Sequence, residues 1–213
     1  QFAFGQNDVG VWDVAGAAIK PELTVATAAR LAERAGAIIH HFDPVTGIEL
    51  ETTGALVTTA RGRKKYDRVV VAAGGWTPKL LPYLKQEVVA RRLTSAWYFA
   101  ENPDYFKGFP PFLQSAPEYC YGLPSSDGFS VKVGFGFNDH YVTGDPDSLP
   151  RELKGEALEQ QVERFSRLRD GLFPGLAPKP YRVNTYVESY TRSMLEHVQH
   201  HPESNDVVVL TGF

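Results

Sequence analysis

Lys132 is the residue whose type and setting point most directly to chemistry. It stands between Val131 and Val133 in an alternating segment, so in a β-strand its ammonium group lies on the face opposite two apolar neighbours. A cation held away from water can stabilise negative charge that develops during a reaction. A solvated strand lysine is the commoner arrangement, and the segment alone leaves both interpretations open.

Three further side chains are candidates for contact with a ligand. Tyr121 stands eleven residues before Lys132, and Tyr190 lies in the later segment "YRVNTYVESYT". A phenol combines an apolar ring with one hydrogen-bonding hydroxyl, which suits the wall of a small-molecule site. A pair of core tyrosines explains the same residues equally well. Glu188, two residues before Tyr190, is either a solvated strand carboxylate or a partner for a cationic amine.

The segment "YDRVVVAAGGWTPKLLPYL", residues 66–84, is typical of a nucleotide-binding sheet, because a buried strand leads through a glycine turn into a helix. The G-x-G-x-x-G loop that would hold a dinucleotide is absent upstream. A G-x-S-x-G nucleophile elbow and a phosphate loop ending in G-K-[ST] are absent as well. Hydrolase and nucleoside triphosphatase chemistry are therefore poor interpretations.

The histidines do not form a convincing metal site. His197, His200 and His201 lie in "EHVQHHPES", which we expect to be a surface loop, and His40 adjoins His41. Carboxylates and cysteines do not accompany them at the spacings of zinc sites. We therefore expect no metal.

Composition limits the partners and the compartment. The 213 residues carry a formal net charge of −3, which favours neither nucleic acid nor an anionic membrane as a partner. The single cysteine, Cys120, excludes an internal disulfide and fits a cytoplasmic location. The chain starts with Gln1 and stops at "VVVLTGF", just after a strand. We therefore expect it to be part of a longer protein.

The elements that would position these residues fall into two groups with different sequence patterns. We predict a helix over residues 20–37 and a hairpin over 47–61 that turns at Gly54. Strands are expected at 9–14, at 37–42 and at 68–73, and the last of these should be buried on both faces. From about residue 88, aromatic alternating strands are predicted at 92–101, 119–124, 129–137 and 181–191, together with a helix over 148–176 that ends near Gly171 and a buried strand at 206–213. The fold class is therefore α/β and α+β, with part of a nucleotide-binding sheet beside a mixed, largely antiparallel sheet covered by helices.

Four stretches taken together resemble the FAD-dependent amine oxidases of the D-amino-acid oxidase superfamily, in particular the monomeric sarcosine oxidase group. They are "AGAAIKPELTVATAARLAERAGAIIHHFDPV", "YDRVVVAAGGWTPKLL", "YGLPSSDGFSVKVGFG" and "HPESNDVVVLTGF". The resemblance covers nearly all of this chain but only the middle and later part of a family member. The missing G-x-G-x-x-G unit would precede Gln1, which explains its absence upstream.

The resemblance implies roles for particular residues. Lys132 would face the flavin and assist oxygen reduction, and Tyr121 and Tyr190 would line the substrate cavity. The positions matching the family's cofactor-binding stretches are Val45, Ala73, Gly74, Trp76 and Gly212.

Three departures from the family pattern matter. The group most like sarcosine oxidase has a histidine four residues after the lysine, where this chain has Gly136. The cysteine that attaches flavin covalently in that group aligns with Glu188, so FAD is expected to be non-covalent and to need the missing N-terminal region. Arg91 and Arg92 precede a strand where the family often has an arginine, and their contact with substrate is left open.

The resemblance implies that the chain contributes to two domains. Residues 15–87 and 186–213 would form a partial FAD-binding domain, and 1–14 and 88–185 a substrate-binding domain. The expected activity is oxidation of a C–N bond of a small amino acid or amine, with oxygen as acceptor and peroxide as product. A dehydrogenase is a close variant. The alternative is a non-catalytic ligand-binding fragment or subunit without its own FAD, completed by another chain or self-associating through open sheet edges.

Overall fold

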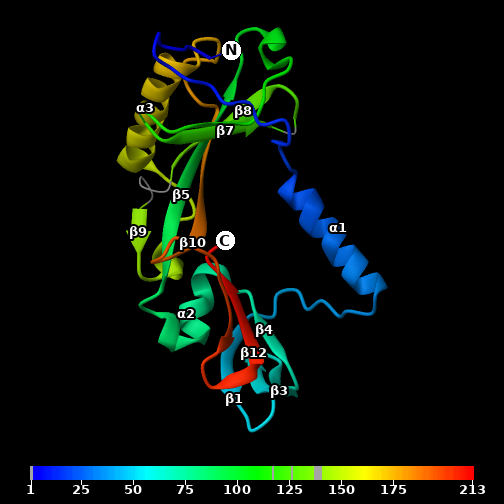
Figure 1. The fold of residues 1–213 in the computed structure, drawn as a ribbon. Helices are drawn as coiled ribbons and strands as arrows, with labels where there is room; N and C mark the ends of the chain where they lie inside the picture. The colour runs from blue at the N-terminus through cyan, green and yellow to red at the C-terminus, as the bar shows by residue number, and fades with distance from the viewer. Residues whose placement is uncertain (1, 117, 126, 137–140) are drawn as a thin grey trace. The chain divides into compact units, whose positions relative to one another are not determined.

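The computed structural model describes residues 2–116, 118–125, 127–136 and 141–213, which form two compact units. Unit 1 consists of Gln1–Ala28, Leu93–His140 and Pro150–Tyr186, and unit 2 of Ala29–Arg92, Tyr141–Leu149 and Val187–Phe213. Strands β5 (Val88–Phe99) and β10 (Arg182–Thr191) each contribute residues to both units (Figure 1). The division into a cofactor domain and a substrate domain stays a prediction.

The predicted antiparallel, aromatic-rich sheet is confirmed. Its strand order is β10-β5-β8-β7-β6, and β9 also pairs with β5. The remaining strands are β6 (Phe112–Gln114), β7 (Cys120–Pro124), β8 (Ser130–Phe135) and β9 (Tyr141–Thr143). Successive side chains of each strand point to opposite faces, so the register of β5, β7 and β8 decides which residues share a face.

One face of this sheet packs on helix α3 (Gly155–Leu172) and forms the core of unit 1. Val131, Val133 and Phe135 of β8 lie in one buried cluster with Phe165 and Leu168 of α3. Burying side chains of this size stabilises the fold by about 1.5–3 kcal/mol each. This packing directs the even-numbered residues of β8, Lys132 among them, to the other face. The helix is shorter than predicted, because it begins only at Gly155.

Unit 2 contains a three-stranded antiparallel sheet made of β1 (Val45–Leu50), β2 (Ala55–Thr59) and β3 (Gly62–Tyr66). It includes the predicted hairpin with Gly54 in the turn. Gly54 has φ +74°, and a Cβ there would lie 2.1 Å from the carbonyl oxygen of Tyr66, so only glycine fits. The Gly54 N–H donates to Oδ2 of Asp206 at 2.9 Å. Asp206 thereby ties the hairpin to the second sheet of the unit.

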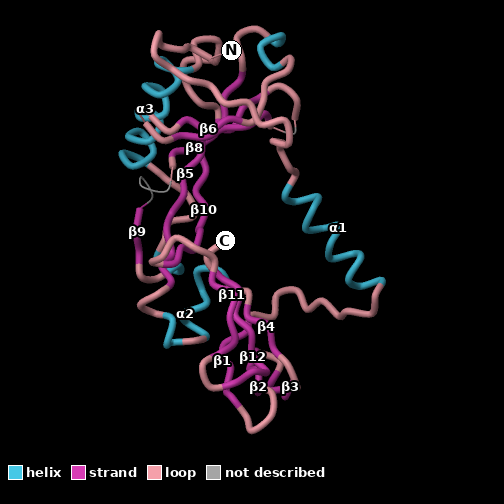
Figure 2. Tube along the Cα trace, viewed as in Figure 1, coloured by secondary structure: helices cyan, strands magenta, loops and turns pink. Residues whose placement is uncertain are grey.

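The second sheet of unit 2 has the order β11-β12-β4, with β11 (His197–His201), β12 (Ser204–Thr211) and β4 (Val69–Val71) (Figure 2). β12 runs parallel to β4 and antiparallel to β11. Val71, Val207 and Val209 are buried, but Val70 is 62% exposed. The prediction that β4 is buried on both faces is therefore wrong. β4 is an edge strand here, and among the described residues only β12 pairs with it.

Three further local predictions differ from the structure. Residues 9–14 and 37–42 form no strand, because alternation alone gives no partner strand for the backbone, and most of their apolar side chains are exposed. The histidine-rich segment that we expected to be a loop is β11. Helix α1 (Pro21–Arg34) is confirmed, although none of its residues is buried.

Short helices complete the chain. They are α2 (Thr77–Leu80), η1 (Gly74–Trp76), η2 (Pro82–Leu84), η3 (Pro103–Phe106) and η5 (Pro146–Ser148). Within the described ranges, no helix has both the length and the apolar character needed to cross a bilayer. The same residues contain no group of three or more histidine, cysteine or acidic side chains placed to hold a metal ion.

Candidate functional site

Lys132 and Tyr121 lie on the same face of the sheet, opposite α3. Lys132 is registered with Trp97 of β5 on one side and with Leu123 of β7 on the other. Tyr121 is registered with Gly134, and a Cβ on that glycine would lie 2.5 Å from Cζ of the tyrosine. The phenol ring therefore lies across Gly134, next to Lys132 along β8. The structure brings these two predicted residues together.

Aromatic side chains surround the Lys132 ammonium group. Nζ of Lys132 lies 5.7 Å from the ring centre of Trp97 and 5.3 Å from that of Tyr186. The guanidinium carbon of Arg182 lies 4.5 Å from the same Trp97 ring. Such cation–π contacts hold a positive charge in place without neutralising it. The sequence did not single out Trp97, Tyr186 or Arg182, because only the strand register shows that they share a face.

Glu188 and Tyr190 form a separate cluster in unit 2. The Tyr190 hydroxyl donates to Oε2 of Glu188 at 2.6 Å. The guanidinium carbon of Arg91 lies 4.8 Å from the Tyr190 ring centre. Within the described residues, no cation lies at ion-pair distance from Glu188, so its carboxylate can accept a further donor. A carboxylate with this geometry could bind a cationic amine.

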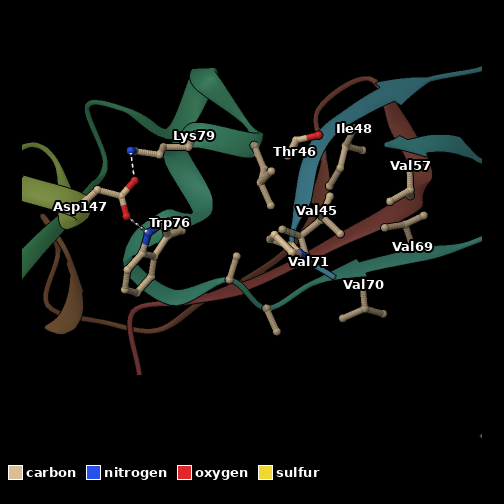
Figure 3. Close-up of a pocket in the computed structure, with 14 residues that line it drawn as sticks. Val45, Thr46, Ile48, Val57, Val69, Val70, Val71, Trp76, Lys79 and Asp147 are labelled. Atoms are coloured by element: carbon tan, nitrogen blue, oxygen red, sulfur yellow. Dashed lines mark hydrogen bonds and ion pairs between the residues drawn. The ribbon is translucent and has the colours of Figure 1, made fainter. Parts of the chain in front are cut away.

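The predicted cofactor contacts gather around a cavity of about 770 Å³ in unit 2 (Figure 3). Its lining comes mainly from β1, β2, β4 and the turn after β4: Pro44, Val45, Thr46, Ile48, Val57, Val69, Val70, Val71, Ala72, Ala73, Trp76, Lys79, Leu80 and Asp147. Val45, Ala73 and Trp76 thus line one apolar cavity. A volume of this size lies in the range of small-molecule sites.

The two predicted glycines lie in neighbouring turns beside this cavity wall, and one hydrogen bond joins these turns. The carbonyl oxygen of Gly74 accepts from Oγ1 of Thr211 at 3.3 Å, and the N–H of Gly212 donates to Oγ of Ser189 at 3.4 Å. Both glycines have positive φ, at +52° and +84°. The turn after β4 and the turn after β12 are therefore adjacent, as expected for the ends of two parallel neighbours.

Charged groups define one end of the cavity. The Trp76 indole N–H donates to Oδ1 of Asp147 at 2.8 Å. Lys79 forms an ion pair with Asp145 at 2.8 Å and another with Asp147. The hydrogen bonds from Lys79 lower the pKa of Asp145, and those carboxylates in turn raise the pKa of Lys79. Asp147 thus fixes the two side chains that close this end.

The cavity fits part of a dinucleotide. A flat base has apolar faces, which match the valine-rich walls. The backbone N–H groups that would bind a pyrophosphate are missing, because they come from a glycine-rich loop that this sequence does not contain. The residues present therefore suit the adenosine end of FAD.

Two departures from the sarcosine oxidase pattern have a clear structural basis. Gly136 is buried, and a Cβ at this position would lie 1.6 Å from Cδ1 of Tyr119. The Tyr119 ring therefore fills the space that a larger side chain at 136 would need. Cys120 is fully buried in the core against α3, and burial raises the pKa of its thiol to about 12. A protonated, inaccessible thiol cannot attach a cofactor.

Comparison with known proteins identifies the family. A profile of the FAD-dependent oxidoreductases matches residues 4–213. The chain belongs to this family. The match extends over both units and includes Lys132 together with the cavity of unit 2.

The relatives are amine oxidases. Monomeric sarcosine oxidase of Streptomyces avermitilis is 25% identical over 213 residues, which is 97% of this chain and 54% of the relative. N-methyl-L-tryptophan oxidase of Citrobacter koseri is 32% identical over 131 residues, which is 60% of this chain and 34% of the relative. The chain spans about half the length of the curated relatives that it matches from end to end.

Solved structures show the same fold. NikD, an unusual amino acid oxidase essential for nikkomycin biosynthesis, superimposes with a TM-score of 0.72 at 23% identity, over 89% of this chain and 51% of that one. Glycine oxidase from Geobacillus kaustophilus gives a TM-score of 0.67 at 18% identity, over 88% of this chain and 47% of the other. The predicted fold class and the family resemblance are both confirmed.

Proposed function

We propose that this chain is the substrate-binding part, with late pieces of the cofactor domain, of an FAD-dependent amine oxidase. The substrate would be a small amino acid or amine, oxidised at a C–N bond, with oxygen as acceptor and peroxide as product. The observation that carries the proposal is the family match over residues 4–213 together with Lys132 on the sheet face opposite α3. When bound, FAD supplies the two-electron redox chemistry, and the protein supplies position and field.

Lys132 provides positive charge for the oxygen half-reaction. Its ammonium group is held by the rings of Trp97 and Tyr186. A fixed cation stabilises negative charge on oxygen as it is reduced, at little cost in reorganisation. Tyr121 forms a wall beside it, with an apolar ring and one hydroxyl for orientation. Glu188 and Tyr190 would contact the amine end of the substrate, because a carboxylate attracts an ammonium group.

FAD would be bound non-covalently, with its adenosine end against Val45, Ala73 and Trp76 and with Gly74 and Gly212 in the adjoining turns. The open edge of β4 supports this assignment, since an additional strand of a longer chain or of a second molecule could pair there. Self-association through this edge is the expected behaviour of the segment by itself. We place the protein in the cytoplasm, which fits its lone buried cysteine.

The test uses the full-length protein. We expect the purified protein to show flavin absorbance and to release the flavin when it is denatured. We also expect it to produce peroxide from N-methyl amino acids. Lys132→Met should slow oxygen reduction at least about a hundredfold, the scale found when one charge-stabilising group is removed, while anaerobic reduction by substrate changes much less. Lys107→Met, which removes an exposed lysine that follows η3 and pairs with Asp104, is the matched control.

Two outcomes would overturn the proposal. A protein that retains no flavin and does not take up added FAD would instead be a ligand-binding subunit. Equal loss of both half-reactions in Lys132→Met would remove the specific role assigned to the lysine.

A further inference from the structure

Glu188 carries a carboxylate that its neighbours hold in place without neutralising its charge. Tyr186, Glu188 and Tyr190 alternate along β10 and so point to one face of the strand. The Tyr190 hydroxyl donates to Oε2 of Glu188 at 2.6 Å. One carboxylate oxygen is therefore occupied, and within the described residues Oε1 is left for a further donor.

A second strand fixes the tyrosine that holds this carboxylate. β5 is the neighbour of β10 in the sheet, and the guanidinium carbon of Arg91 lies 4.8 Å from the Tyr190 ring centre. A cation over the face of a phenol ring is attracted by the ring electrons and favours one ring orientation. Arg91 and Tyr190 are both half-buried, so solvent screens this contact only in part. Arg91 thus acts on Glu188 through Tyr190.

The charge environment of Glu188 differs from that of several other carboxylates in unit 2. Cations pair with those: Asp43 with Arg61, Glu49 with Arg63, Glu51 with Lys65, and Asp145 with Lys79. In the part of the chain that the structure describes, no cation lies at ion-pair distance from Glu188. A carboxylate that is oriented but not paired attracts an ammonium ligand and can accept a proton from it.

Amine oxidation requires a proton acceptor of this kind. An alkyl ammonium group with a pKa near that of lysine, about 10.4, is neutral in only about one molecule in a thousand at pH 7.4. The nitrogen lone pair that forms the new C=N bond becomes available only after the ammonium group has lost a proton. A positioned side chain that takes such a proton typically contributes about 10²–10⁴-fold in rate.

We propose that Glu188 is the base that removes a proton from the ammonium form of the substrate, with Tyr190 as its hydrogen-bond donor and Arg91 as a positioning residue. The proposal rests on the proposed function for the statement that the bound amine is then oxidised. In this step an N–H bond of the ammonium group breaks and an O–H bond forms at Oε1 of Glu188, while the electron pair stays on nitrogen. Glu188 is half-buried, so the proton can afterwards pass to water.

The pH dependence of substrate oxidation tests the proton transfer. In the full-length protein, anaerobic flavin reduction by an N-methyl amino acid is followed by stopped-flow absorbance between about pH 6 and pH 10. Glu188→Gln keeps the shape of the side chain but cannot take a proton, so this variant depends on amine that is already neutral. Its second-order rate constant should be about a hundredfold or more below wild type near neutral pH. It should rise about tenfold per pH unit, whereas the wild-type constant should change much less.

Binding gives a readout that does not involve turnover. The unreactive ligand is 2-aminoisobutyrate, whose α-carbon carries no hydrogen, and its N-trimethyl derivative has no N–H to donate. Calorimetry should show that the full-length protein binds 2-aminoisobutyrate about tenfold or more tightly than the derivative, as expected for one hydrogen bond to a charged group. Glu188→Gln should remove most of this preference. A preference that persists in Glu188→Gln would come from the size of the ligand and would overturn the proposal.

Control variants separate the base from the groups that support it. Glu203→Gln changes an exposed glutamate in the turn between β11 and β12 of the same unit and should leave both readouts unchanged. Tyr190→Phe keeps the carboxylate but removes its hydrogen-bond donor, so it should slow flavin reduction by a smaller factor and keep the wild-type pH dependence. Arg91→Lys keeps a cation at the ring and should retain more activity than Arg91→Met.

The outcomes distinguish this inference from the proposed function. An active oxidase whose Glu188→Gln variant keeps the wild-type pH dependence would refute the base and retain the oxidase. A lower rate in Glu188→Gln by the same factor at every pH would make Glu188 a binding contact and not a base. A protein with Glu188-dependent ammonium binding and no flavin chemistry would refute both the oxidase and the proton transfer, and would leave an ammonium-binding site.

Discussion

Gly136 offers a direct test of how the sheet face around Lys132 is built. Substitution by alanine places Cβ 1.6 Å from Cδ1 and 2.6 Å from Cγ of Tyr119. Both are atoms near the root of the ring, so the whole ring has to leave its position. The backbone cannot move apart easily, because the N–H of Gly136 donates to the Tyr119 carbonyl oxygen at 2.8 Å. We therefore expect Gly136→Ala to lower the free energy of unfolding by about 1–3 kcal/mol.

A double-mutant cycle isolates the steric cause of this loss. With Tyr119→Ala as background, the new methyl group meets no ring, and Gly136→Ala should be neutral or stabilise by about 0.5–1 kcal/mol, as glycine-to-alanine changes in strands do. The coupling free energy between the two positions should therefore reach about 2 kcal/mol. Tyr119→Phe keeps the ring and should preserve the full cost of Gly136→Ala.

Urea unfolding followed by far-ultraviolet circular dichroism measures these differences. Gly171→Ala is the matched control, because Gly171 lies in α3 with nothing within 4 Å of its would-be Cβ, and this change should raise stability by up to about 1 kcal/mol. An equal cost of Gly136→Ala in the wild-type and Tyr119→Ala backgrounds would refute the reasoning. The loss would then come from the backbone and not from the tyrosine ring.

Two further predictions concern the cavity of unit 2 and the core of unit 1. Asp147→Ala removes the acceptor of the Trp76 indole N–H and one ion-pair partner of Lys79. The fluorescence emission of Trp76 should therefore shift to the red, and the free energy of unfolding should fall by about 1 kcal/mol. Asp147→Asn keeps a hydrogen-bond acceptor and should preserve the emission wavelength. Burial raises the pKa of Cys120 to about 12 from 9.0 and also raises that of Tyr98, so the folded state keeps both groups protonated while the unfolded chain ionises. Stability should therefore fall as pH rises above about 9 for Cys120 and above about 10 for Tyr98, by about 1.4 kcal/mol per pH unit for each group, and urea midpoints of Cys120→Ala should decline less steeply. An identical decline in Cys120→Ala would contradict the assignment.

The sequence predicted the elements whose signals are local. The hairpin with Gly54 in its turn, helix α1 and the alternating strands β5, β7 and β8 follow from periodicity and turn residues, and all are present. The segments 9–14 and 37–42 alternate in the same way but form no strand, because a strand also requires a neighbour for its N–H and C=O groups. Pattern alone does not supply that neighbour. β11 was missed for the converse reason, since its partner β12 determines its conformation.

The candidate site was predicted in part, for a similar reason. Lys132 and Tyr121 were found through the family resemblance, and their shared face follows from the register of β7 with β8. Trp97 on β5 lies far in sequence from Arg182 and Tyr186 on β10, and they meet only because these two strands are neighbours in the sheet. Alternation shows that a residue faces one side of a strand, but it does not show what stands opposite on the next strand.

The cross-strand pairs also explain how this chain departs from the sarcosine oxidase pattern. Gly134 of β8 and Gly136 just after this strand carry no side chains, and the rings of Tyr121 of β7 and of Tyr119 just before β7 lie across them. Aromatic rings that cover cross-strand glycines restore the packing that the glycines lack. Restoring a histidine at position 136 alone would therefore displace a tyrosine before it reached any ligand. Differences in specificity within this family should be sought in such pairs, with both members changed together.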